Sequence, residues 1–426
     1  MANDGVSNDR ERQMSREIIV LGAGMVGVSI AWHLVRRGHS VVLVDRREPG
    51  RETSFGNAGI IQREAVKPYP FPRDLGTLAR VLPNRAVDIR YRLGGVMRAA
   101  GPLLHYWQHS SPRRYDSIVP EYASLISLAL DTHAPMIAAA GAEALVRKEG
   151  WLEVYRTVEG LDAERREAEE AASRFRVNHR LLDADALQAL EPHLVGGLAG
   201  AIHWLDSWTV ADPGALVQAY AASMEAAGGR LMRAEVSDIS RAGQGWRVTT
   251  DQGALEAGEL VLAMGPWSGD WLSRQGISVP LFVKRGYHMH YAAKGEARLG
   301  NWVMDAEVGY LLAPMRAGIR LTTGAELARR EAPPDHGQLA AAERVARRFF
   351  PLGERLDAEP WKGARPCTPD MKPVIGPVPD RQGLWLAFGH GHHGFTLGPA
   401  TGRLLAEMID GEPTAIDMAP FRVDRF

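Results

Sequence analysis

Cysteine is almost missing from this chain. Cys367 is the only one among 426 residues. A single cysteine excludes disulfide bonds within the chain, zinc sites built on Cys-x-x-Cys pairs and iron–sulfur clusters held by cysteines. A chain without internal disulfides suits a reducing compartment.

Long apolar runs are also missing. No stretch approaches the roughly 20 apolar residues that a membrane-spanning helix needs. The first residues, 1–17, are polar and charged and lack the apolar centre of a signal peptide. We therefore expect a cytoplasmic protein, with peripheral contact on the inner face of the cytoplasmic membrane left open.

Neither sign of charge dominates the composition. Fifty Lys and Arg against 51 Asp and Glu give a formal net charge of -1, so electrostatics predict no nucleic-acid partner. One stretch is basic: between Arg63 and Arg114, basic residues far outnumber acidic ones and alternate with aromatic and aliphatic side chains. That pattern predicts either a membrane-surface or partner contact, or an ordinary solvated face.

A dinucleotide-binding pattern is present near the N-terminus. An apolar run at 18–21 leads into Gly22-Ala23-Gly24-Met25-Val26-Gly27, an apolar helix follows, and Asp45 closes a second apolar run. The first glycine allows the tight turn, the second lets the backbone approach a pyrophosphate, and the third lets the helix pack on the sheet. Asp45 can accept a hydrogen bond from a ribose hydroxyl.

Strand and helix patterns alternate along the rest of the chain. After a Gly- and Pro-punctuated stretch to Pro120, we expect helices at 121–144, 161–175, 184–190, 214–227, 337–350 and 400–410. Strands are expected at 151–155, 230–239, 245–250, 260–264, 282–291, 302–304, 310–314, 319–323 and 384–388. The fold class is therefore α/β, with a Rossmann-like domain assembled from discontinuous segments and a second, α+β domain with a mainly antiparallel sheet.

The expected domain ranges follow from these blocks. We expect a floppy tail at 1–15. The Rossmann-like domain takes 16–95, 196–275 and 356–426, and the substrate domain takes 96–195 and 276–355.

Two loops next to predicted strands have compositions that suit a cofactor. Residues 53–59 are small, hydroxyl, amide and glycine residues whose N–H groups can hold phosphate or flavin edges, although a surface turn would have the same composition. The strand at 260–263 runs into Met264 and Gly265, where a sharp turn suits the adenine end of a cofactor. Any loop after a buried strand would look similar.

Arg365 stands in a proline-stiffened string, Arg-Pro-Cys-Thr-Pro-Asp. A guanidinium held in this way can bind a carboxylate with two parallel hydrogen bonds. The alternative is a structural arginine bonded to backbone carbonyls or to Asp370.

The glycine loop at 389–398 contains His390, His392 and His393. Its spacing does not match the i, i+4 face of a zinc helix, so we predict no metal. A glycine loop that leads into a helix N-terminus suits negative charge on a reduced ring instead.

Together these strings resemble the FAD-dependent D-amino-acid oxidase and dehydrogenase family, which includes glycine and sarcosine oxidases. The strings at 53–59, Arg365 and Gly389 most closely resemble its bacterial D-amino-acid dehydrogenase branch. The resemblance implies noncovalent FAD, because Cys367 does not align with the cysteine that some sarcosine oxidases join to flavin.

The family pattern also implies roles for individual residues. Arg365 matches the arginine that binds the substrate carboxylate, and Tyr310 resembles a tyrosine that assists it; Tyr287, His288 and His392 fall beside the flavin or in the substrate pocket. No residue is assigned as a certain acid or base. The implied cofactor contacts are Gly22, Ala23, Gly24, Met25, Val26, Gly27, Asp45, Arg46, Thr53, Ser54, Asn57, Ala58, Gly59, Ile60, Val236, Ala263, Gly265, Trp267, His390, Gly391, His392, His393, Gly394, Phe395 and Thr396.

The predicted reaction is oxidative deamination of a D-amino acid, with hydride passing from the α-carbon to flavin N5. A quinone or another electron carrier is the expected acceptor. A secondary amine or imino acid, such as D-hydroxyproline or sarcosine, is the alternative substrate, as oxidase or dehydrogenase. An NAD-linked dehydrogenase and a flavin-binding subunit without turnover of its own also stay open.

Overall fold

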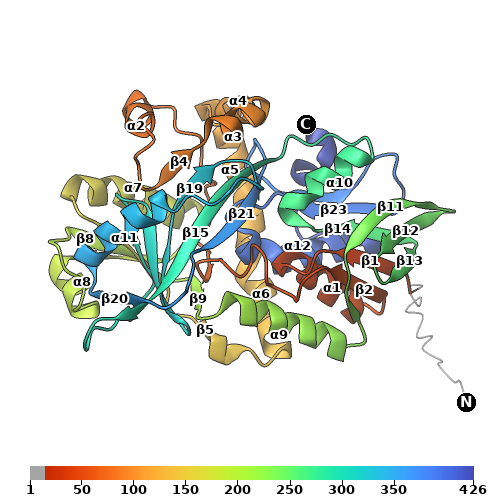
Figure 1. Cartoon of the computed structure of the whole chain (residues 1–426), viewed down its shortest axis with the longest axis horizontal. Coiled ribbons are helices and arrows are strands. Elements are labelled where there is room, and N and C mark those ends of the chain that lie inside the picture. Colours follow the sequence, from red (N-terminus) through yellow and green to blue (C-terminus); the bar gives the residue numbers. More distant parts are fainter. Residues whose placement is uncertain (1–14) are drawn as a thin grey trace, which may run out of the picture.

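The computed structural model describes residues 15–426. The predicted tail at 1–15 therefore lies outside the described residues except for its last position. Two large sheets lie side by side, one at each end of the long axis, and helices cover both (Figure 1). The predicted α/β class, with a Rossmann-like sheet and a mainly antiparallel second sheet, is confirmed.

The first sheet has six strands in the order β10-β2-β1-β14-β23-β22, parallel except for β22. These strands are β1 (Glu17–Leu21), β2 (Ser40–Asp45), β10 (Arg230–Arg233), β14 (Glu259–Leu262), β22 (Val374–Pro377) and β23 (Leu384–Phe388). Strands β1 and β14 are almost continuously apolar because helices and a second sheet bury both faces.

Helices α1 (Met25–Arg36), α9 (Pro213–Ala226) and α12 (Gly394–Asp410) cover one face of this sheet. A meander of β11 (Val236–Ala242), β12 (Gly245–Thr250) and β13 (Gly253–Ala257) lies near its other face, with α10 (Ser268–Arg274). Helices α1 and α12 pack closely because Gly398 and Gly402 carry no side chain there: a Cβ on Gly402 would lie 2.6 Å from the Ser29 backbone.

The second sheet has eleven strands and is mainly antiparallel. They are β4 (Ile89–Tyr91), β6 (Trp151–Tyr155), β7 (His179–Asp183), β8 (Gly200–Trp204), β15 (Phe282–Ala293), β16 (Val303–Asp305), β17 (Tyr310–Met315), β18 (Gly318–Thr322), β19 (Ala325–Leu327), β20 (Leu352–Arg355) and β21 (Trp361–Cys367). Helices α7 (Val158–Phe175), α8 (Ala184–Leu190) and α11 (Gly337–Phe349) pack on it.

The remaining elements join the two halves. Helices α2 (Leu75–Val81), α3 (Leu93–Arg98) and α4 (Ala100–His109) form a group at the top of the molecule (Figure 1). Helices α5 (Pro112–Ser127) and α6 (Ala129–Ala139) run down from it and pack against α12. A small sheet contains β3 (Ile60–Ile61), β5 (Val146–Arg147) and β9 (Trp208–Val210).

Strand pairing differs from the expected domain ranges at three points. Strands β4, β8 and β21 fall within ranges assigned to the Rossmann-like domain, yet all three pair into the eleven-stranded sheet. Helices α5 and α6 fall within a substrate-domain range, yet they cover α12. Local pattern predicts that a strand exists but not which sheet it joins, because pairing is decided by tertiary packing.

Two helices begin before a proline at which the sequence pattern predicted a boundary. Helix α5 begins at Pro112 and runs through Pro120, and α12 begins at Gly394 and runs through Pro399. Pro399 cannot donate to the Phe395 carbonyl, but His133 Nε2 lies 3.1 Å from that oxygen and takes the missing donor's place.

The single strand expected at 230–239 is split, because β10 pairs with β2 and β11 turns into the meander.

Candidate active site

One continuous cavity of about 1770 Å³ runs between the two large sheets. Its lining includes the glycine turn after β1 at one end and β15, β21 and the start of α12 at the other. It therefore joins the dinucleotide pattern to residues more than three hundred positions downstream.

The three glycines of the turn between β1 and α1 have two different roles. Gly22 and Gly27 are required by the fold, since a Cβ on Gly22 would lie 2.5 Å from the Ala263 carbonyl and one on Gly27 only 1.8 Å from the Gly22 carbonyl. Gly24 is different: a Cβ there would meet nothing closer than Ser54 Oγ at 3.5 Å, and Gly24 faces the cavity. The N-cap residue of α1, Gly24, has no side chain to bond the helix start. Met25 N donates to Ser54 Oγ at 3.0 Å, and the N–H groups that follow suit a pyrophosphate.

The acidic residue that ends β2 is positioned beside this turn. Asp45 Oδ2 accepts from Ala23 N at 2.7 Å and Oδ1 accepts from Arg47 N at 2.9 Å, which leaves lone pairs on both oxygens for a ribose. Gly265 adopts a positive φ and has open space around it. The guanidinium of Arg46 lies 4.8 Å from the Trp267 ring centroid at this end of the cavity.

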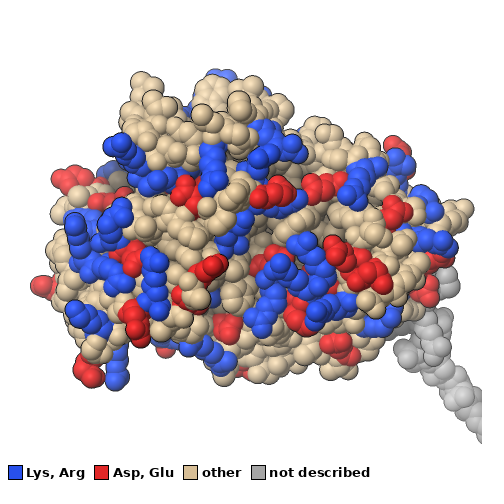
Figure 2. All heavy atoms as spheres, viewed as in Figure 1, with Lys and Arg blue, Asp and Glu red and all other residues tan. Residues whose placement is uncertain are grey.

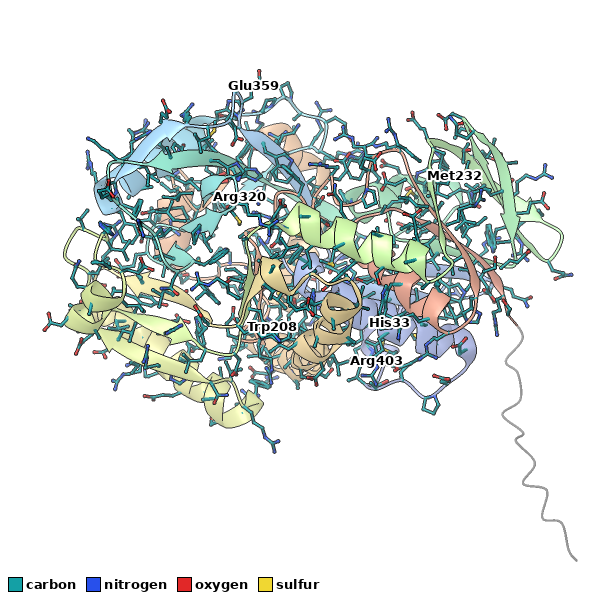
Figure 3. All side chains as sticks on the ribbon, turned by 90° about the horizontal axis from the view of Figure 1, so that it is seen from below. His33, Trp208, Met232, Arg320, Glu359 and Arg403 are labelled. Carbon is teal, nitrogen blue, oxygen red and sulfur yellow. The ribbon has the colours of Figure 1, made fainter. Side chains whose placement is uncertain are left out.

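The segment 53–60 connects the two halves of the cavity. Ser54 Oγ accepts from Met25 N at 3.0 Å, and Thr53 Oγ1 donates to the Ala364 carbonyl at 2.9 Å. Arg320, which lies in the interior between the sheets (Figure 3), donates to the carbonyl oxygens of Phe55 and Asn57. The segment is thus fixed from both sides, and it lines the cavity.

The three loop histidines point to different partners. His390 Nε2 lies 2.9 Å from Thr401 Oγ1, and His393 Nδ1 lies 2.6 Å from the Tyr122 hydroxyl. His392 faces the cavity. Burial lowers the pKa of His390 to about 3 and that of His393 to about 4, so both are neutral at pH 7. The uncapped α12 N-terminus follows them, with Gly394 at the cavity wall.

Arg365 lies against a glycine on the neighbouring strand. A Cβ on Gly286 would lie 2.6 Å from Arg365 Nη2, so the guanidinium occupies the space above that residue. Arg365 Nη1 donates to the Gly324 carbonyl at 2.9 Å, and within residues 15–426 the side chain has no carboxylate partner. The bond that the sequence allowed to Asp370 is absent there, because Arg425 binds that carboxylate at 2.7 Å. A cation that faces a cavity and has no anionic partner is suited to binding a carboxylate ligand.

Tyr310 and Tyr287 require a correction. Alternate residues of a strand point to opposite faces, and Arg365 shares its face with Lys284 and Gly286. The rings of Tyr287 and Tyr310 point to the other face, into the core beneath α11. Tyr287 donates to Glu326 at 2.6 Å, and Tyr310 contacts Phe349. The structure therefore does not bring the Tyr310 hydroxyl to Arg365, although both tyrosines border the cavity.

His288 lies on the correct face but behind an aromatic side chain. Its ring stacks on Trp361 at 4.9 Å, and Trp361 rather than His288 lines the cavity. Burial, followed by the charge of Arg320, lowers the pKa of His288 to about 2. His288 is thus a neutral support for the cavity wall.

The other expected cofactor residues divide into two groups. Those that line the cavity are Gly22, Gly24, Met25, Val26, Asp45, Arg46, Thr53, Ser54, Asn57, Ala58, Ile60, Val236, Ala263, Gly265, Trp267, His390, Gly391, His392, Gly394 and Phe395. Five lie behind it: Ala23, Gly27, Gly59, His393 and Thr396. Thr396 Oγ1, for example, accepts from Gln62 N at 3.1 Å and so positions the segment after β3. These five residues support the cavity wall from behind, since they form backbone turns or buried hydrogen bonds there.

Sequence reasoning missed three polar side chains in the Arg365 half of the cavity: Lys284, Tyr69 and Tyr106. Lys284 Nζ donates to the Tyr106 hydroxyl at 3.0 Å, which donates in turn to the Tyr69 carbonyl at 2.6 Å. Alternation along β15 could have identified Lys284, because it shares a face with Gly286. Tyr69 and Tyr106 could not be found locally, since α4 brings Tyr106 to the site and Tyr69 lies in the loop before α2.

The cavity fits the predicted cofactor. Open glycines, the N-terminus of α1 and an acid suited to a ribose lie at one end, and Gly394 with the α12 N-terminus lies at the other. That arrangement provides for a pyrophosphate and for a ring that gains negative charge.

Comparison with known proteins agrees with this cofactor assignment. A D-amino acid dehydrogenase of Cereibacter sphaeroides is 32% identical, over 96% of this chain and 95% of the relative. Another, from Bradyrhizobium diazoefficiens, is 30% identical over 96% and 99%. Among solved structures, glycine oxidase from Geobacillus kaustophilus has a TM-score of 0.71 at 23% identity, covering 97% of this chain and 100% of its own. L-proline dehydrogenase from P. horikoshii has a TM-score of 0.72 at 19% identity, covering 97% and 98%. These two structures share the fold.

The family model described as DAO, FAD dependent oxidoreductase, matches residues 17–408. That range includes the glycine turn after β1, Arg365 and the start of α12. The chain is a member of the DAO family of FAD-dependent oxidoreductases.

Proposed function

We propose that this protein oxidises a D-amino acid to a 2-oxo acid and ammonia. The observation that supports this most directly is Arg365, a cation that faces the cavity near the α12 N-terminus and has no carboxylate partner among residues 15–426. The two relatives described above are named D-amino acid dehydrogenase, which favours an amino acid over a simple amine.

In this reaction the chain orients and the cofactor supplies the redox chemistry. Arg365 binds the substrate carboxylate and so points the α-carbon toward the region bounded by His390, Gly391 and Gly394. FAD, held by the glycine turn after β1 and by the start of α12, would supply the two-electron acceptor for the α-hydrogen. The N–H groups of the α12 N-terminus stabilise negative charge there. Water then hydrolyses the imino acid. His392 is neutral and adds no charge of its own, because burial holds its pKa well below the usual value.

An anaerobic visible spectrum tests this proposal. The purified yellow protein is mixed with D-alanine, D-proline or hydroxy-D-proline, and loss of the oxidised flavin band is followed. Bleaching by primary D-amino acids supports the proposal, and bleaching by the cyclic imino acids or sarcosine alone favours the secondary-amine alternative. A colourless protein, or a flavin that no amine reduces, contradicts it.

We further propose that the electrons pass to a quinone or another carrier and that α2–α4 touch the inner face of the cytoplasmic membrane. Several large apolar side chains on these helices and next to them are exposed, among them Leu75 at 83%, Leu82 at 74% and Met97 at 73%. Figure 2 shows this upper part of the molecule as mostly uncharged, with Lys and Arg gathered below it. Such a surface suits an anionic bilayer.

Within residues 15–426, no helix has both the length and the apolarity to cross a bilayer. The membrane proposal is therefore one of peripheral contact. Sedimentation with vesicles containing anionic lipid tests it, and oxygen consumption tests the acceptor. Hydrogen peroxide formed at the turnover rate would identify an oxidase instead.

A further inference from the structure

Lys284 places a second positive charge beside Arg365. The two residues are direct partners in the register of β15 and β21, so both side chains rise from one face of the sheet into the cavity. The Arg365 guanidinium lies over Gly286, two positions along β15 from Lys284. Two residues along a strand span roughly 7 Å. The two charges are thus near one another but offset along the sheet.

Neither charge has an anionic partner among the described residues. Arg365 donates to the Gly324 carbonyl, and Lys284 donates to the Tyr106 hydroxyl and lies 4.5 Å from the centroid of that ring. Across the part of the chain that the structure describes, neither forms a salt bridge. Arg285, the residue next to Lys284, is different, since it pairs with Glu326 at 2.6 Å on the opposite face.

The adjacent groups do not supply a negative charge either. His392 is close enough for Arg365 and Lys284 both to act on it: burial and these two charges hold its pKa well below the usual value. Burial raises the pKa of the Tyr69 hydroxyl above its usual range, and the Tyr106 hydroxyl donates its hydrogen to the Tyr69 carbonyl at 2.6 Å. A partly buried cation without an anion is unfavourable in a packed interior. The presence of two such cations side by side is better explained by an anionic ligand.

We propose that Lys284 binds a second anionic group of the substrate, and that the preferred substrate is an amino acid with two carboxylates. The inference rests on the proposed function, because the first carboxylate is the one held by Arg365. The second carboxylate belongs either to the side chain, as in D-glutamate and D-aspartate, or to a substituent on nitrogen, as in iminodiacetate.

A purely structural role for Lys284 makes a different prediction. In that case its stem only packs on Tyr106 and attaches α4 to β15. A methionine of similar length would keep the packing, and the choice between charged and uncharged substrates would not change.

The first experiment compares isosteric substrates with the intact holoenzyme. We expect kcat/KM for D-glutamate to exceed that for D-glutamine by about tenfold or more, mainly through KM, and the same for D-aspartate against D-asparagine. A matched comparison of iminodiacetate with sarcosine separates side-chain from nitrogen-linked carboxylates. In Lys284→Met the acid-to-amide ratio should fall to about one, Lys284→Arg should retain much of it, and the exposed Lys294→Met should keep the wild-type ratio.

The second experiment measures binding without turnover. Glutarate and butyrate differ by one carboxylate, and each is titrated into the holoenzyme while the flavin absorption is followed. Tighter binding of glutarate that is lost in Lys284→Met supports the proposal. Equal binding of the two acids, together with D-glutamine oxidised as well as D-glutamate, overturns it. If Lys284→Met fails to fold, the wild-type comparisons still decide.

The two experiments also separate this inference from the proposed function. A protein that oxidises D-alanine readily but does not prefer D-glutamate contradicts the role of Lys284 alone. A flavin that no amino acid reduces contradicts the proposed function, while Lys284-dependent binding of glutarate would still identify a two-cation site.

Discussion

Arg365 and Gly286 touch across two paired strands: a methyl group added to Gly286 would lie 2.6 Å from Arg365 Nη2. We expect Gly286→Ala to push the guanidinium aside and to raise KM for the amino acid by about tenfold, a cost of roughly 1.4 kcal/mol. Steady-state kinetics measure this. Gly258→Ala, at a glycine with nothing within 4 Å of its Cβ position, is the matched control and should leave KM unchanged.

Removal of the guanidinium should have a larger effect. Arg365→Met keeps the bulk but leaves the substrate carboxylate without its charged partner, which costs about 3 kcal/mol. We expect kcat/KM to fall on the order of 100-fold, with FAD content unchanged. Arg365→Lys should recover part of the loss. A value of kcat/KM close to wild type in Arg365→Met would show that Arg365 does not bind the substrate.

The glycines after β1 should separate cofactor binding from folding. Gly24→Ala adds a methyl group that the protein itself can accommodate, since its nearest contact is 3.5 Å, but that group occupies the space facing the cavity. We expect weaker FAD binding by about tenfold or more, with little change in thermal unfolding of the FAD-free protein. Gly22→Ala should instead destabilise the protein, because its φ is +106° and the added Cβ lies 2.5 Å from the Ala263 carbonyl. Equal FAD affinity in Gly24→Ala and wild type would place the phosphates elsewhere.

Stability should depend on pH through Glu153. Burial and then Glu164 raise the pKa of Glu153 to about 7, while the unfolded chain ionises near 4.5. The folded state therefore binds the proton more tightly, and this carboxyl group costs stability progressively as pH rises from about 4.5 through 7. Glu153→Gln, which keeps an oxygen for the Trp204 indole N–H, should stabilise the protein by about 3 kcal/mol at pH 8 and very little at pH 4.5. Urea unfolding at the two pH values measures this, and a pH-independent difference would contradict it.

Substitutions on the exposed surface of α2–α4 should weaken membrane binding without affecting folding or FAD binding. Leu82→Glu and Met97→Glu change side chains that are 74% and 73% exposed, so folding and FAD content should be unaffected. Binding to anionic vesicles should fall severalfold because both apolar burial and charge attraction are lost. Val158→Glu, an exposed apolar position at the start of α7, serves as the control. Undiminished sedimentation of the double variant would remove α2–α4 from the contact.

The sequence alone predicted those helices, strands and turns whose formation depends on residues close together in the chain. The glycine spacing at 22–27 located the turn between β1 and α1, and β6, α8, β12 and β23 have the expected bounds. The site was predicted less well because a strand pattern does not state which face meets a ligand. Tyr287 and Lys284 both lie on β15, and only the packing of α11 on one face assigns Lys284 to the cavity.

Tertiary partners explain the remaining differences. Pro399 lies within α12 because His133, far earlier in the chain, bonds to the carbonyl that this proline leaves free. Trp361 rather than His288 forms the cavity wall because β21 pairs with β15. Neither relationship can be predicted from the local composition of the sequence.

The order of the six-stranded sheet has a consequence for biosynthesis. Strand β14 pairs on one side with β1 and on the other with β23, which begins only at Leu384. Until the ribosome has released that segment, β14 keeps an unpaired edge that can pair with other chains. We expect nascent or prematurely terminated chains to need chaperone protection for longer than their length suggests, and FAD to be captured only by finished ones.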